Sequence, residues 1–73
     1  MKKNADLVAF GKTIRLLRQK KGLFQKELAK RSGLSPTYVS TLERGVQNPS
    51  LMSLASLAKG LGCSMAETCK GIK

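Results

Sequence analysis

Glycine and proline punctuate this chain at regular intervals, and their spacing limits each segment of regular structure to a few turns. The punctuating residues are Gly22, Gly33, Pro36, Gly45, Pro49, Gly60, Gly62 and Gly71. Most of the segments between them repeat their apolar residues with the period of a helix and not with the alternation of a strand. Because 73 residues make one small domain, this pattern predicts an all-α fold of five short helices.

Residue types at the segment ends indicate where the first two helices begin and end. Asp6 suits the N-cap of the first helix, and Gly22 suits the left-handed residue that ends it. The second helix is predicted from Gln25 to about Ser32. The apolar stripe of the first helix consists of Leu7, Phe10, Ile14 and Leu17.

Three serines predict the starts of the remaining helices. Ser35 followed by Pro36 supplies an N-cap and a favoured first helical residue, and this third helix is predicted to continue to Arg44. The segment 64–67 matches a capping box, so a fifth helix of one or two turns is predicted there. Ser50 caps the predicted fourth helix, whose inward residues are Leu51, Leu54, Leu57, Ala58 and Leu61.

The formal net charge of +10 restricts the partners more than the fold. Fourteen Lys and Arg stand against four Asp and Glu, with no His. Such an excess favours nucleic acid, an anionic membrane surface or an acidic protein as the partner. No apolar stretch approaches the ~20 residues that span a bilayer.

Metal, cofactor and catalytic sites are not expected with this composition. The chain has no His and its four carboxylates are scattered, which leaves neither a ligand cluster nor an acid–base pair. On one helix, Cys63 and Cys69 would lie ~9 Å apart, beyond the reach of a disulfide. We interpret them as small buried hydrophobes in a reducing compartment.

The segment from Gln25 to Arg44 has the pattern of a helix-turn-helix, which is a short helix, a tight turn and a second, capped helix. Gly33 stands where the turn requires a positive φ, and the small Ala29 allows the two helices to approach closely. The shared apolar wedge consists of Leu28, Leu34, Val39 and Leu42.

The residues from Gly11 to Glu67 resemble the lambda-repressor-like, Cro/XRE-type helix-turn-helix DNA-binding domains. The resemblance rests on the elements LA, SGLS, ERG and NPS in that order, followed by L-x-x-LA-x-x-LG. It implies a single compact five-helix domain over residues 1–73, with the helix-turn-helix core at 25–44. It also implies that the third helix enters the DNA major groove while the second crosses the backbone.

The resemblance places base contacts at the positions of Pro36, Thr37 and Thr41, with Ser40 beside them. Thr37 and Thr41 are the best candidates, because a hydroxyl can bond base donors and acceptors and a methyl can contact the thymine methyl. Pro36 stands where relatives carry Gln and can offer only van der Waals contact, which favours a contribution of DNA shape. Tyr38 is predicted to face outward as a further base-reading residue, or to contact a sugar or phosphate.

Phosphate contacts are expected from helix starts, loop amides and cations. Gln25 lies at the start of the second helix, where free N–H groups and the helix dipole attract an anion. Phe24 stands where the family has Thr or Ser and cannot cap this helix, so we expect either a frayed start or packing against the first helix. The other candidates are Lys26, Ser35, Arg44, Gln47, Asn48 and Arg15, with Lys12 beside Arg15.

Two further groups have predicted structural roles. Arg18 and Glu43 match a family pair that forms an inward salt bridge between the first and third helices, with a direct DNA contact as the alternative for Arg18. The predicted fifth helix, in the region 64–73, offers an apolar surface that would pair two copies of the chain. The pairing residues are Met65, Thr68, Cys69 and Ile72, and the alternative is that Met65 and Cys69 close the monomer core.

Together, the motif and the charge predict a sequence-specific, double-stranded DNA-binding regulator of transcription without enzymatic activity. We expect a cytoplasmic homodimer on a palindromic operator, encoded by a bacterium or phage. A phage-type repressor, a restriction-modification controller and an antitoxin all fit. One alternative is a protein-interaction module on the same fold, which Phe24 and Pro36 permit. A cationic membrane-active peptide is disfavoured, because the charges do not segregate along one amphipathic helix.

Overall fold

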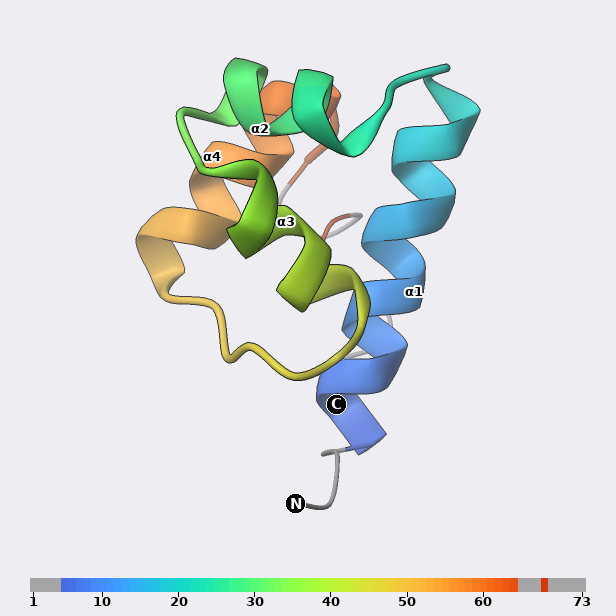
Figure 1. Cartoon of the computed structure of the whole chain (residues 1–73), viewed down its shortest axis with the longest axis vertical. Helices are drawn as coiled ribbons and strands as arrows, with labels where there is room; N and C mark the ends of the chain where they lie inside the picture. Colours follow the sequence, from blue (N-terminus) through green and yellow to red (C-terminus); the bar gives the residue numbers. More distant parts are fainter. Residues whose placement is uncertain (1–4, 65–67, 69–73) are drawn as a thin grey trace.

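The computed structural model describes residues 5–64 and 68 of the chain. Within that part the chain has no strand, which confirms the all-α class (Figure 1). Its helices are α1 (Ala5–Lys20), α2 (Gln25–Ser32), α3 (Pro36–Glu43) and α4 (Leu51–Leu61). The predicted fifth helix falls mainly outside the described residues. Thr68 is helical, and its N–H donates to the Ser64 carbonyl at 3.0 Å.

The first helix begins earlier than predicted and ends as predicted. α1 starts at Ala5, so Asp6 lies inside its first turn and not at the N-cap. The Asp6 carboxylate still lies near the positive end of the helix dipole. After Lys20 the chain turns through Gly22, whose φ of +71° is the left-handed conformation that ends the helix.

Two serines cap α3 and α4 as the sequence predicts. Oγ of Ser35 accepts a hydrogen bond from the N–H of Tyr38, and Oγ of Ser50 accepts one from the N–H of Ser53, each at 3.0 Å. Pro36 is the first residue of α3, a position where a missing N–H leaves no hydrogen bond unmade. The Ser35 cap defines the start of α3, the helix that carries most of the predicted base-reading residues.

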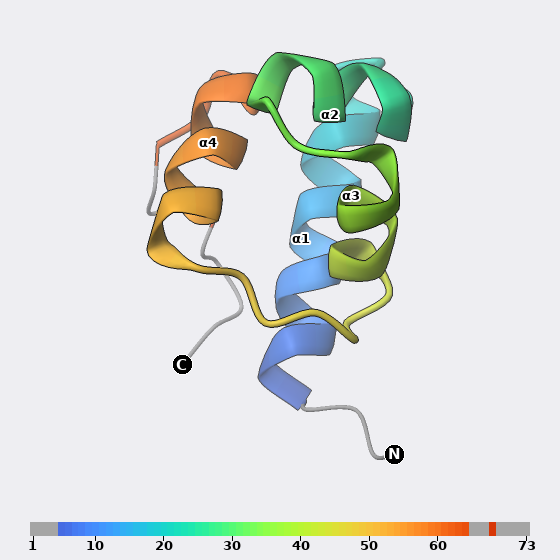
Figure 2. The same cartoon turned by 60° about the vertical axis from the view of Figure 1, so that its left-hand side comes forward.

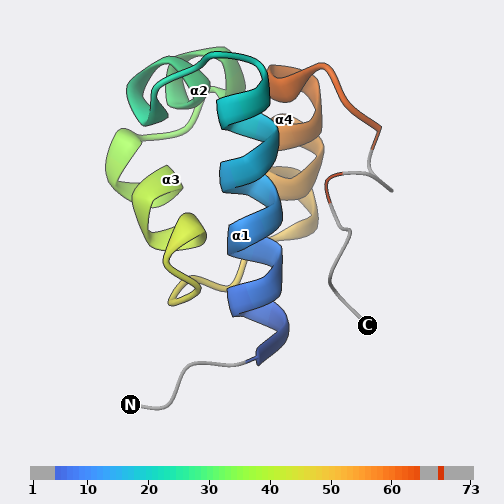
Figure 3. The same ribbon diagram turned by 90° about the vertical axis from the view of Figure 1, so that its right-hand side faces the viewer.

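The helices surround one apolar core. α2 lies across one end of the molecule and contacts both α3 and α4, while α3 packs along α1. Seen from two further directions, α3 lies on one side of α1 and α4 on the other (Figure 2, Figure 3). The buried residues of the core are Phe10, Ile14, Leu28, Ala29, Val39, Leu42, Leu57 and Leu61.

Two glycines allow helices to pack closely, because neither brings a side chain of its own to the contact. A Cβ atom on Gly11 would overlap the main-chain carbonyl groups of Leu42 and Glu43, so α1 and α3 are in close contact there. A Cβ atom on Gly60 would overlap Oγ of Ser32, so the Ser32 side chain of α2 packs directly on the backbone of α4. These contacts set the distances of α3 and α2 from the rest of the fold.

The start of α4 departs from the prediction. Leu51, predicted to face the core, has 73% of its surface exposed, and the neighbouring Met52 has 77%. Leu51 is the first residue of α4, before the turn that packs on the core. The inward stripe therefore begins with the partly buried Leu54 and continues through the buried Leu57 and Leu61.

Candidate nucleic-acid interface

The turn between α2 and α3 sets the orientation of the two helices. Gly33 has φ +68° and ψ 25°, a left-handed conformation that other residues adopt only with strain. The N–H of Leu34 donates back to the Ala29 carbonyl at 2.9 Å, and the Leu34 side chain packs against the core. Ser35 then starts α3. The predicted helix-turn-helix is therefore present.

One face of α3 is open to solvent along its first turns and carries no charge. Pro36 and Thr37 are exposed, and Ser40 and Thr41 are half-buried. Thr37, Ser40 and Thr41 share this face because residues three and four apart lie on the same side of a helix. Val39, on the opposite side, is fully buried. The structure thus brings four of the five predicted base-reading residues together.

The two threonines of this face differ in their hydrogen bonding. The Thr41 hydroxyl donates to the main-chain carbonyl of Tyr38 at 2.8 Å, a bond that Thr commonly makes within a helix. The Thr37 hydroxyl makes no hydrogen bond within residues 5–64 and 68. The Thr37 hydroxyl can therefore donate a hydrogen bond to a partner without breaking one that it already makes, which the Thr41 hydroxyl cannot.

The Tyr38 side chain does not face outward as predicted, and its predicted contact with DNA stays a prediction. Its half-buried ring packs against the core, and its hydroxyl donates to Oγ of Ser53 in α4 at 2.9 Å. Oγ of Ser53 also accepts from the Ser50 hydroxyl at 3.0 Å. Position 38 lies between the buried and open faces of α3, so the large ring turns inward. Tyr38 thereby ties α3 to the first turn of α4.

The start of α2 also differs from both expectations for Phe24. Phe24 is 76% exposed, so most of its surface is not packed against α1. The helix is not frayed, because the N–H of Leu28 donates to the Phe24 carbonyl at 3.0 Å. The carboxylate of Glu27 accepts from the Phe24 N–H, also at 3.0 Å. Glu27 thus supplies one half of a capping box, and the other half, a bond from the Glu27 N–H to a side chain at position 24, is not made by Phe24.

Arg18 of α1 and Glu43 of α3 form an ion pair beside the start of α2. Nε of Arg18 lies 2.6 Å from Oε2 of Glu43, Nη2 lies 3.0 Å from Oε1, and the side chains are only 11% and 3% exposed. Nη1 of Arg18 donates to the Leu23 carbonyl at 2.7 Å. Nε2 of Gln25 donates to Oε1 of Glu43 at 3.1 Å. The pair is an inward, structural contact, and it occupies one of the two amide hydrogens of Gln25.

Polar and charged groups flank the open face of α3. Lys26 is exposed in the first turn of α2, and Arg44 is exposed at the end of α3. In the loop to α4, Asn48 is exposed and Gln47 is half-buried. These side chains can contact an anion without any loss of core packing.

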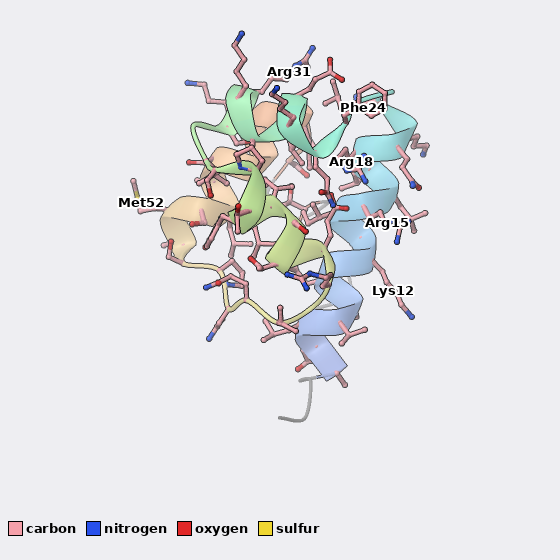
Figure 4. All side chains as sticks on the ribbon, in the orientation of Figure 1. Lys12, Arg15, Arg18, Phe24, Arg31 and Met52 are labelled. Carbon is pink, nitrogen blue, oxygen red and sulfur yellow. The ribbon has the colours of Figure 1, made fainter. Side chains whose placement is uncertain are left out.

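The cations of α1 fall into two groups. Lys12, Arg15 and Lys20 are exposed, and Lys12 and Arg15 point outward, whereas Arg18 points inward toward α3 (Figure 4). Only the first group is available to an anion in solution.

The predicted subunit contact is largely untested by the structure, since Met65, Cys69 and Ile72 lie outside the described residues. Thr68 is described and is fully buried, and its hydroxyl donates to the Ser64 carbonyl at 2.9 Å. A side chain buried by its own chain cannot contact a second copy, so Thr68 is corrected from a subunit contact to a core residue.

The described residues contain no group of three or more His, Cys, Asp and Glu side chains that could hold a metal ion. None of the helices formed by these residues has the length and apolar character needed to cross a membrane.

Comparison with known proteins identifies the family. The model of the helix-turn-helix family HTH_3 matches residues 14–67, which include both helices of the motif and the turn between them. The chain belongs to the helix-turn-helix family. Among its members, the uncharacterized HTH-type transcriptional regulator y4dJ of Sinorhizobium fredii is 47% identical over 57 residues, covering 78% of this chain and 74% of y4dJ.

Two similar helix-turn-helix proteins are controllers. The control protein C.MunI of a Mycoplasma species is 36% identical over 61 residues, which is 82% of each chain. The crystal structure of the restriction-modification controller protein C.AhdI from Aeromonas hydrophila superposes with a TM-score of 0.88 at 46% identity. The matched region covers 89% of this chain and 98% of C.AhdI. The predicted family and fold are therefore confirmed.

Three residues that support this helix-turn-helix were missed from the sequence. Gly11 carried a signal, because Gly inside a helical pattern often marks a close approach of backbones. Glu27 also carried one, since it stands three residues after the helix start, as in a capping box. Ser53 carried none, because its bond to Tyr38 depends on how α4 is placed.

Proposed function

We propose that this chain binds double-stranded DNA sequence-specifically and regulates transcription, without enzymatic activity. The observation that carries the proposal is the open, uncharged face of α3 with Thr37, Ser40 and Thr41, held beside the start of α2 by the Gly33 turn. An α-helix fits the major groove, and the second helix of such a motif contacts base edges there. Relatives named HTH-type transcriptional regulators support the same function.

The base contacts are assigned to the open face of α3. Thr37 and Thr41 present a hydroxyl and a methyl group each, with Ser40 between them and Pro36 in van der Waals contact. None of these side chains is long, so sequence-dependent DNA shape contributes to the choice of site. Tyr38 contributes by holding α3 against α4.

The part of the DNA affinity that does not depend on the base sequence is assigned to the groups around α3. Gln25 offers its N–H at the start of α2 and its remaining amide hydrogen, because its other amide hydrogen bonds Glu43. The net charge of +10 would also accelerate association with DNA. The full set of proposed phosphate contacts is Gln25, Lys26, Ser35, Arg44, Gln47, Asn48 and Arg15.

The active form in this proposal is a homodimer on a palindromic operator. A two-fold axis would place two copies of α3 ~34 Å apart, one turn of DNA. The contact between subunits is assigned to Met65, Cys69 and Ile72. The similarity to C.AhdI at 46% identity and to the control protein C.MunI supports a restriction-modification controller among the three settings. Such a regulator acts in the bacterial cytoplasm, on the nucleoid.

The proposal is tested by selection from a randomised duplex library, followed by titration of the enriched duplex with the full chain. If the complex contains 6 to 10 phosphate contacts, the affinity should fall by about 10³- to 10⁵-fold between 50 and 200 mM salt. Sedimentation of the complex should show two chains on each duplex. Absence of duplex binding at the lower salt concentration would defeat the proposal and favour a protein-interaction module.

A further inference from the structure

We infer that Thr41 recognises the amino group of a base, N6 of adenine or N4 of cytosine, by accepting a hydrogen bond from it. The inference rests on the proposed DNA-binding function and adds the chemistry of one contact. Oγ1 of Thr41 donates to the Tyr38 carbonyl at 2.8 Å. A hydroxyl has one proton and two lone pairs. A Thr41 side chain that keeps this bond can therefore only accept.

The partner of this bond is held firmly in place. The Tyr38 ring packs against the core and its hydroxyl bonds Ser53, so the carbonyl that accepts from Thr41 cannot move away independently. Thr41 is half-buried, and its β-branched side chain has few rotamers in a helix. Donating to DNA would require Thr41 to break a bond already made, whereas accepting from DNA would not.

Base edges in the major groove offer few donors to such an acceptor. The donors are the N6 amino group of adenine and the N4 amino group of cytosine, while N7, O6 and O4 are acceptors. Each base pair carries one of these amino groups. The inference therefore specifies that Thr41 contacts the amino group of the pair, and it excludes contact of the hydroxyl with N7 or a carbonyl oxygen.

Thr37 supplies the contrast on the same face of α3. It lies one turn earlier and is exposed, and within the described residues its hydroxyl is unbonded. Thr37 can donate or accept. The two threonines thus differ in the hydrogen-bonding groups of a base that they can recognise, although their side chains are the same.

The test uses the duplex enriched by the full chain and base analogues placed at each pair in turn. A purine without the 6-amino group or a pyrimidinone without the 4-amino group deletes the donor, and 7-deazapurines delete N7. At one pair, loss of the amino group should weaken the wild-type chain and Thr41→Ser by about threefold to tenfold, as expected for one neutral hydrogen bond. Thr41→Val, which has no hydroxyl, should bind both duplexes equally.

The inference would be overturned if Thr41→Val bound every duplex as the wild type does, or if Thr41→Val lost sensitivity to N7 at any pair. Thr37→Val is the matched control, and its effect should fall on a different base pair. Thermal denaturation should show that both variants are folded. Failure of the library to yield any enriched duplex would defeat the proposed function as well. An enriched duplex with no amino-dependent contact at Thr41 would defeat this inference alone.

Discussion

Gly11 of α1 lies directly against the main-chain carbonyl of Leu42 in the last turn of α3. A methyl group at Gly11 would overlap this carbonyl and that of Glu43, and backbone cannot rotate away as a flexible side chain can. Gly11→Ala should therefore lower the free energy of unfolding by about 1 to 3 kcal/mol, although Ala is the better helix former. Urea denaturation measures this loss.

The control for Gly11→Ala is Lys12→Ala at the exposed neighbouring position. This change should alter the stability by less than about 0.5 kcal/mol. A Gly11→Ala variant as stable as the wild type would contradict the close contact between α1 and α3.

The ion pair of Arg18 and Glu43 predicts strong energetic coupling between α1 and α3. Both side chains are nearly buried, so removal of one partner leaves the other charge without its main partner. Arg18→Met alone or Glu43→Gln alone should each destabilise the fold by about 3 to 5 kcal/mol. The double variant should lose less than the sum of the two changes. A thermal-denaturation cycle with additive losses would disprove the coupling.

Much of the fold could be predicted because its signals are local. The cap of α3 depends on Ser35 and the N–H of Tyr38, three residues away. The turn between α2 and α3 depends on one residue, Gly33, which adopts a positive φ. Such features require no knowledge of the rest of the molecule, and both lie where the sequence predicts.

The two side-chain orientations that were wrongly predicted, those of Tyr38 and Leu51, depend on tertiary packing. A helical wheel leaves Tyr38 between two faces, and only the placement of Ser53 on α4 decides that the ring turns inward. Leu51 fits the apolar stripe of α4 by spacing, yet its place in the first turn leaves it exposed. In both cases the sequence carries the residue type but not the position of the neighbouring helix.

The N-cap of α3 is predicted to contribute measurably to the stability of the folded chain. Ser35→Ala removes the oxygen that accepts from the N–H of Tyr38 and should destabilise the chain by about 1 kcal/mol. Ser35→Thr keeps an acceptor and should lose less. Chemical denaturation of the three chains gives the comparison, and equal stability of all three would refute a role for the cap.

Removal of the Ser32 hydroxyl is predicted to leave the stability of the chain unchanged or to raise it. Its Oγ is buried against Gly60 and has no hydrogen-bond partner within residues 5–64 and 68. Ser32→Ala removes this unpaired group and favours the helix, so the stability should stay unchanged or rise by up to about 1 kcal/mol. Ser32→Thr adds a methyl group at the same contact and should destabilise. The melting temperatures of the two variants and the wild type test this prediction. A clearly lower melting temperature of Ser32→Ala would reveal a partner for the hydroxyl.

Lys26 is predicted to contribute affinity without selectivity. Its exposed ammonium group lies in the first turn of α2, where a DNA phosphate would approach and where no base edge is expected. Lys26→Ala should weaken binding to all duplexes alike and reduce the salt dependence by about one counterion per subunit. The matched control is Lys59→Ala on α4, whose side chain is also exposed and should contribute little. Equal losses in the two variants, or a changed preference among duplexes in Lys26→Ala, would contradict this assignment.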